Sequence, residues 1–242
     1  MTDLLYIVRQ SGWGYDEELR YSLRSVAKYA RNIGRVFVCG DIPEFLSDEV
    51  ITISCNNPYD RKAKNLLCRL DYAIAHSDIG ERFLLSSDDI FLRKVTNLDN
   101  YPHYWKNGAE ISVPEELENT KIGKIIAGAR EVLARFDYPL QDYGGGHCLH
   151  WVYQELWNNM PKIKQASMES KYGVPVDLLL GGAIEKIYQP QHKVRTDYKF
   201  DYVPKASELR GADCFSTGDR PDLWGGDKWL EKLYPKKCRY EK

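Results

Sequence analysis

The stretch RFLLSSDDIFL, residues 82–92, decides how the rest of the chain is interpreted. Its apolar run at residues 83–85 is typical of a short strand in a sheet that is covered on both faces. Asp88 and Asp89 would then follow the carboxyl end of that strand. Ligands of open α/β sheets bind in the crevice outside such ends, so we expect a ligand site here.

Two adjacent carboxylates repel each other and lose hydration when they are partly buried, unless a cation or hydrogen-bond donors compensate. A divalent ion that also binds a substrate phosphate would do so, and the pair predicts a metal site at Asp88 and Asp89. The alternative is a solvated acidic turn after a strand. The return to apolar residues at 90–92 favours carboxylates that are held from both sides.

The composition is that of an ordinary globular protein. A chain of 242 residues fits one α/β domain, or one domain with a small lobe, and a net charge of -1 gives no global drive toward nucleic acid or an anionic membrane. The six cysteines are scattered, without a C-x-x-C pair, which argues against a zinc or disulfide framework. With no signal-peptide pattern and no apolar run as long as a membrane span, we expect a cytoplasmic protein.

The first half of the chain alternates strands and helices, as in a doubly wound sheet. Strands are expected at residues 4–8, 35–39 and 50–53, and Arg9 would end the first of them. A helix capped by Asp16 has apolar residues at helical spacing, and its polar face is expected to be solvated.

A second helix is expected at residues 61–76. Cations gather at its start, where the helix dipole favours anions: Arg61, Lys62, Lys64 and Arg69, together with Asn65. Solvated lysines are one explanation. The other is that these side chains and the free backbone donors of the first turn bind a diphosphate.

The second half carries further candidates. Residues 110–113 could form an edge strand, and helices are expected at residues 122–136, 161–171 and 176–187. Three glycines precede His147 and His150, which would share one side of a helix that begins there and continues to Trp157. This segment forms either a site, with Trp151 beside it, or a tight junction. Asp177 is either a helix-start acid or a site carboxylate.

Residues 188–205 alternate aromatic and basic side chains. That pattern suits a polyanion, or a stacked sugar or base, and it suits a surface hairpin equally well. The lysine-rich tail after residue 227 is expected to be solvated.

Several motifs occur in one order over roughly the first two fifths of the chain: LLYIVRQ, EELRYSLRSV, RVFVCGDIPEFL, KAKN and FLLSSDDIFL. This series resembles the Stealth-type capsular polysaccharide transferases and related bacterial and phage sugar transferases with one GT-A domain. GGGHCLHWVYQEL and CFSTGD look like later motifs of that group, although the proline expected beside the histidine is missing.

The resemblance implies an α/β, GT-A-like (Rossmann-like) fold, with a mostly parallel sheet flanked by helices and a mainly helical C-terminal part. Residues 1–106 would bind the donor, and residues 107–242 would form the acceptor side and a C-terminal extension of one compact domain. It also implies a nucleotide-sugar such as a UDP-sugar, with Mn²⁺ or Mg²⁺ at Asp88 and Asp89. The implied donor-binding residues are Arg9, Lys62, Lys64, Asn65, Arg69 and Asp88; the acceptor-side residues are His150 and Trp151; the catalytic candidates are Asp177 and His147.

The expected function is therefore a metal-dependent glycosyltransferase. The acceptor would be a hydroxyl of a polysaccharide or, in a phage setting, of a hydroxymethylated DNA base. Two alternatives remain open: a hexose-1-phosphate transferase with the same donor site, and a non-catalytic module that binds a nucleotide or a sugar.

Overall fold

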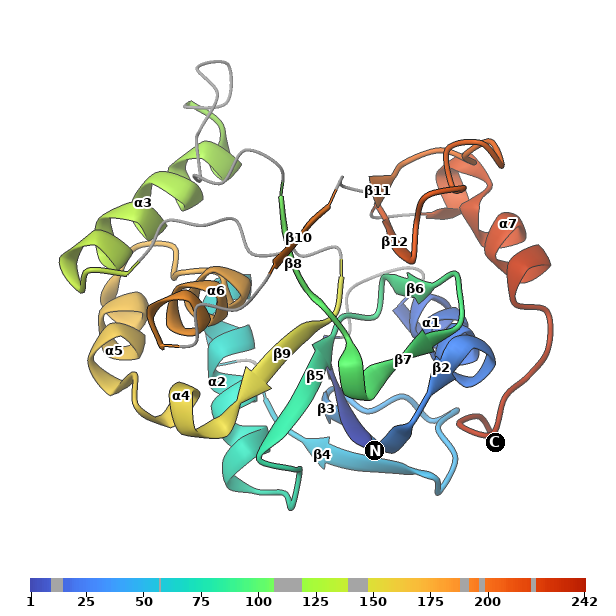
Figure 1. Cartoon of the computed structure of the whole chain (residues 1–242), viewed down its shortest axis with the longest axis horizontal. Helices are drawn as coiled ribbons and strands as arrows, with labels where there is room; N and C mark the ends of the chain where they lie inside the picture. The colour runs from blue at the N-terminus through green and yellow to red at the C-terminus, as the bar shows by residue number, and fades with distance from the viewer. Residues whose placement is uncertain are drawn as a thin grey trace.

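The computed structural model describes residues 1–9, 15–56, 58–106, 119–138, 148–187, 192–195, 199–218 and 221–242. Its centre is a five-stranded sheet in the order β4-β3-β1-β5-β9 (Figure 1). The strands are β1 (Thr2–Val8), β3 (Ile33–Gly40), β4 (Val50–Ser54), β5 (Arg82–Ser86) and β9 (His150–Tyr153). The first four are parallel, and β9 is antiparallel to β5.

Both faces of the inner strands β1 and β5 are buried, which explains their continuous apolar runs, whereas the edge strand β4 is largely exposed. In β1, Leu5 and Ile7 face one core cluster, while Leu4 and Val8 face the other. Helix α1 (Tyr15–Tyr29) covers the second face, and α2 (Lys62–Ala75) covers the first. The helices α3 (Lys121–Arg135), α4 (Gln154–Asn158), α5 (Pro161–Glu169) and α6 (Val176–Ile187) lie on the side of α2. The expected α/β architecture, with helices in the second half, is confirmed.

Smaller sheets and helices surround this core. Strand β12 (Cys214–Thr217) is antiparallel to β6 (Ile90–Leu92) and parallel to β11 (Lys199–Phe200). Strand β8 (His103–Lys106) pairs with β10 (His192–Arg195), and β2 (Ala30–Arg31) pairs with β7 (Thr96–Asn97). The remaining elements are η1 (Leu98–Asn100), η4 (Pro221–Trp224) and α7 (Gly226–Leu233).

Two expectations for the second half are wrong. No helix runs from His150 to Trp157: residues 150–153 form strand β9, because their backbone pairs with β5, and only then does α4 begin. Within residues 188–205, the described strands β10 and β11 do not pair with each other as a surface hairpin would require, since β10 pairs with β8 and β11 with β12. Residues 110–113 lie outside the described residues.

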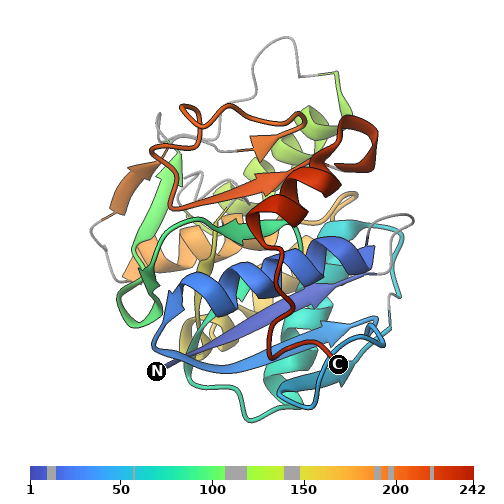
Figure 2. The ribbon, with the colours of Figure 1, turned by 90° about the vertical axis from the view of Figure 1, so that its right-hand side faces the viewer.

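The polar face of α1 and the C-terminal tail were both expected to be solvated. Instead, they bind each other. The carboxylate of Glu241 is buried and accepts hydrogen bonds from Nε and Nη2 of Arg24, both at 2.8 Å. Arg20 Nη1 lies 3.4 Å from the same carboxylate, and Glu241 forms a β-bridge with Leu46. Figure 2 shows α7 and the tail beside α1. A buried acid therefore ties the tail to α1 and to the segment between β3 and β4.

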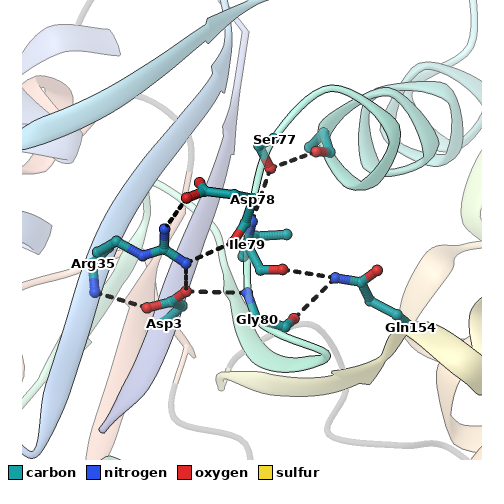
Figure 3. Close-up of polar contacts among 8 residues, drawn as sticks. Asp3, Arg35, Ser77, Asp78, Ile79, Gly80 and Gln154 are labelled. Atoms are coloured by element: carbon teal, nitrogen blue, oxygen red, sulfur yellow. Dashed lines mark hydrogen bonds and ion pairs between the residues drawn. The ribbon is translucent and has the colours of Figure 1, made fainter.

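A second polar network closes the amino end of the sheet (Figure 3). Asp3 in β1 accepts hydrogen bonds from Nη2 of Arg35 at 2.7 Å and from the backbone N–H groups of Arg35 and Gly80 at 2.8 and 3.1 Å. Arg35 also pairs with Asp78 at 2.6 Å, and Gln154 donates to the backbone carbonyls of Ile79 and Gly80. This network joins β1, β3, the start of α4 and the loop before β5 on the side opposite the expected site.

Among the described residues, no helix is long and apolar enough to cross a lipid bilayer.

Candidate functional site

The candidate site lies where the strand order reverses. The chain first adds β3 and β4 on one side of β1, and then crosses over α2 to place β5 on the other side. Tyr6 of β1 is paired with Ser86 of β5, so the two carboxyl ends lie at the same edge of the sheet. Arg9 follows β1 and is exposed, while Asp88 and Asp89 follow β5. Such a switch point is the usual ligand crevice of an open α/β sheet.

The turn that carries Asp88 and Asp89 is held by short-range contacts. The hydroxyl of Ser87 donates to the carboxylate of Asp89 and lies 3.5 Å from Oδ1 of Asp88. The backbone N–H of Ile90 donates to the carbonyl of Ser87 at 3.3 Å, and Thr217 of β12 donates to the carbonyl of Asp89 at 3.3 Å. Both carboxylates are half-buried and share one turn between two buried strands.

The electrostatics of this pair are unfavourable without a cation. Burial, followed by repulsion from Asp89, raises the pKa of Asp88 from 3.8 to about 7, and the ammonium of Lys62 only partly opposes this. Among the described residues, no basic side chain lies within ion-pair distance of Asp88 or Asp89. A divalent ion would favour the charged form of both side chains.

The donor set fits an ion that is shared with a substrate. Within the described part of the chain, no group of three or more histidine, cysteine or acidic side chains could hold a metal. Two carboxylates alone suit Mg²⁺ or a similar hard ion that completes its shell with water and substrate phosphates. The residues therefore fit an ion bound together with a phosphate-bearing ligand.

The start of α2 lies close to this turn. Lys62 is exposed and near enough to act on the pKa of Asp88. Lys64 is half-buried beside Gly173, and Arg61 lies over the ring of Tyr172 at 5.6 Å. The first turn holds no acidic residue, and its N-cap has no side-chain hydrogen bond. Cations and free backbone donors at this helix start form a surface that suits an anion.

Asn65 and Arg69 are buried, although the sequence placed them in a cationic cluster at the start of the helix. The side chain of Asn65 accepts from the backbone N–H of Tyr59 at 3.0 Å and donates to its carbonyl at 2.5 Å, which shapes the loop before α2. Arg69 is 1% exposed and donates to the carbonyl of Val8, to Asp41 at 3.3 Å and to the carbonyl of Cys55 at 3.2 Å. Both residues hold loops that border the crevice. Their direct contact with a nucleotide-sugar stays a prediction.

Gly40 shows how closely Arg69 is packed. Its φ is +125°, and a Cβ atom would overlap the carbonyl of Val8 and the guanidinium of Arg69. Only glycine fits this position at the end of β3 without strain.

The described acceptor-side candidates lie on two elements, α6 and β9. Asp177 is half-buried in the first turn of α6, and His147 lies outside the described residues. His150 and Trp151 are 6% and 3% exposed within β9, opposite Leu85 and Leu84 of β5. The indole of Trp151 donates to the carbonyl of Tyr101 at 2.7 Å. Their roles stay predictions.

Several polar residues near the crevice escaped the sequence analysis. Ser22 and Ser25 lie on the apolar side of α1, both 0% exposed, among Leu19, Leu23 and Val26. The sequence did offer a signal for them: two serines within the apolar stripe of a helix indicate buried hydroxyl groups, which require hydrogen-bond partners. Glu18 of the same helix accepts a hydrogen bond from Thr217 at 3.1 Å.

Comparison with known proteins finds a similar fold but no matching family. No family model and no curated protein sequence matches this chain. The crystal structure of an active-site mutant of LgtC, a protein of the GT-A fold, matches with a TM-score of 0.52 and 12% sequence identity, over 96% of this chain and 95% of that chain. This chain has a GT-A-like fold. At this identity the likeness concerns the fold alone, so the resemblance to Stealth-type transferases stays a prediction.

Proposed function

We propose that this chain is a metal-dependent glycosyltransferase that moves a sugar from a nucleotide-sugar to an acceptor hydroxyl. The proposal rests chiefly on one observation: two adjacent carboxylates, of which Asp88 has a raised pKa, lie at the switch point of a GT-A-like sheet without a basic ion-pair partner among the described residues. The likeness to LgtC, itself a GT-A glycosyltransferase, supports it at the level of the fold.

In this proposal Asp88 and Asp89 hold Mn²⁺ or Mg²⁺. A bound divalent ion would stabilise the negative charge that develops on the departing nucleotide diphosphate. Lys62, Lys64 and the free N–H groups of the first turn of α2 would bind the diphosphate oxygens. Arg9, at the end of β1, would contact the nucleotide. Fixed charges of this kind reduce the reorganisation needed in the transition state.

An inverting transfer needs a base that takes the proton of the acceptor hydroxyl, and Asp177 and His147 are the candidates. The donor half, residues 1–106, and the acceptor half, residues 107–242, would act as one domain, since β9 and β12 of the second half pair with β5 and β6 of the first. The six cysteines are free thiols, which supports a reducing, cytoplasmic location.

A thermal-shift screen of nucleotide-sugars with and without Mn²⁺ tests the donor site, because a ligand that binds the native state raises its stability. We expect a UDP-sugar, or another nucleotide-sugar, to raise the melting temperature only when the metal is present. Asp89→Ala should remove this shift and the transferase activity, while the exposed-site control Asp48→Asn should keep both. Full activity of Asp89→Ala in the presence of metal would refute the assignment.

Product analysis by mass spectrometry distinguishes the alternatives. A glycosyltransferase releases a nucleoside diphosphate, whereas a hexose-1-phosphate transferase releases a nucleoside monophosphate and leaves a phosphodiester. A non-catalytic module would bind a nucleotide without a divalent ion and would consume no donor. Parallel reactions with a polysaccharide and with hydroxymethylated duplex DNA identify the acceptor class.

A further inference from the structure

The turn that carries Asp88 and Asp89 is closed at its base by buried hydroxyl groups. Ser86 precedes the turn and Ile90 follows it. The hydroxyl of Tyr6 lies 3.0 Å from Oγ of Ser22 in α1 and is within hydrogen-bonding reach of the hydroxyl of Ser86, whose proton is also directed at the carbonyl of Ser87 at 3.2 Å. Ser22 in turn donates to the carbonyl of Ile90 at 2.5 Å. One chain of hydrogen bonds therefore joins both ends of the turn.

The direction of these hydrogen bonds follows from the number of protons. A carbonyl only accepts, so the single hydroxyl proton of Ser22 is directed at Ile90, and Tyr6 must donate to Ser22. Burial raises the pKa of Tyr6, which keeps its proton available for this bond. Tyr6 and Ser22 are both 0% exposed, so water does not compete for these groups. Such a network in a low-dielectric interior fixes the positions of its members.

Ser25 extends the same arrangement along β6. It accepts a hydrogen bond from the backbone N–H of Leu92 at 2.9 Å and donates to the carbonyl of Ser22 at 2.7 Å. The backbone of β6 thus binds serines of α1, while β12 pairs with it as a strand. Helix α1 acts on the turn through side chains that lie far from it in sequence.

We propose that Tyr6 and Ser22 are positioning residues that set the relative placement of the Asp88 and Asp89 carboxylates for metal binding. This inference rests on the proposed function. A site with only two protein carboxylates depends strongly on their spacing, because the rest of the metal shell comes from substrate and water. Residues behind metal ligands typically change metal affinity by about 10- to 100-fold.

The test compares Tyr6→Phe with a matched control, Tyr234→Phe. Each variant loses one buried hydroxyl that binds near β6, but Tyr234 donates to the carbonyl of Leu92 at 2.8 Å, beyond the turn. Calorimetric titration with Mn²⁺ in the presence of UDP measures the Kd. We expect the Kd to rise about tenfold in Tyr6→Phe and in Ser22→Ala, and by less than about twofold in Tyr234→Phe.

The outcomes separate this inference from the proposed function. If the wild-type protein binds Mn²⁺ with UDP and Tyr6→Phe shifts the Kd no more than Tyr234→Phe does, the positioning role is refuted and the proposed function stands. If the wild-type protein binds no Mn²⁺, both proposals fail. Amide hydrogen exchange of residues 86–90 gives a second readout, which should accelerate in Tyr6→Phe and not in Tyr234→Phe; equal exchange in the two variants would also refute the positioning role.

Discussion

Replacing Asp88 by asparagine should stabilise the metal-free protein at alkaline pH. The unfolded chain releases the proton of Asp88 near pH 3.8, whereas the folded protein keeps it to about pH 7. Between these values the folded state binds more protons than the unfolded state, so the free energy of unfolding of the wild type falls as the pH rises. Asparagine has no proton to release and avoids this loss.

The size of the effect follows from the shift in pKa. Between pH 5 and pH 7 the loss covers about two pKa units, or about 2.7 kcal/mol. Because Asp88 is half-buried and water screens part of the repulsion, we expect about half of this, roughly 1.4 kcal/mol. The advantage of Asp88→Asn over the wild type should therefore grow by roughly 1.4 kcal/mol between pH 5 and pH 8.

Urea denaturation with EDTA at the two pH values measures this difference. Asp48→Asn, which changes an exposed acid, serves as the control and should show no such growth. Adding Mn²⁺ and UDP should reverse the order at pH 8, since only the wild type gains binding energy. An advantage of Asp88→Asn that is the same at pH 5 and pH 8 would contradict the reasoning, because it would show that the carboxylate is not destabilised by its surroundings.

Three further predictions concern stability. Glu241→Gln should lower the free energy of unfolding by about 2 kcal/mol at pH 7, because Arg24 loses a bidentate carboxylate. Urea denaturation should show the same loss for Arg24→Met and no added loss in the double variant. Additive losses would argue against this pairing. Burial would raise the pKa of Asp3, but its hydrogen bonds with Arg35 and Gly80 lower it. The wild type should therefore lose stability as the pH falls below about 4, while Asp3→Asn loses less. Parallel curves of unfolding free energy against pH for the two proteins would contradict this. Gly40→Ala should cost at least about 1 kcal/mol at its positive φ and weaken nucleotide binding in the thermal-shift assay, and an unchanged melting temperature would refute the close packing against Arg69.

The sequence was most informative where structure depends on neighbours in the chain. Strands buried on both faces are visible as unbroken apolar runs, and β1, β3 and β5 lie where those runs occur. Asp88 and Asp89 were found by the same local logic, as polar residues that follow one run. The raised pKa of Asp88 has burial as its first cause, which depends on the fold, and repulsion from the next residue as its second, which the sequence shows.

Features that depend on distant residues were missed. Strand β9 pairs with β5 from a position more than sixty residues away, and nothing in HWVY alone distinguishes that pairing from a helix. Arg24 and Glu241 are 217 positions apart, so the polar face of α1 looked solvated. Arg69 looked like a surface cation in a basic cluster, although the fold buries it against three strand ends. Burial of a polar side chain is a tertiary property that spacing does not show.

At the proposed metal site, the raised pKa of Asp88 would couple metal binding to the release of a proton. With a pKa of about 7, this carboxyl group holds about half a proton on average at neutral pH. A metal ion that binds there must expel that proton, so its apparent affinity should rise with pH up to about pH 8 and then level off. Calorimetry in buffers of different ionisation enthalpy would count the released protons. Acidification would thus empty the site while the polar network around Asp3 keeps the opposite edge of the sheet intact.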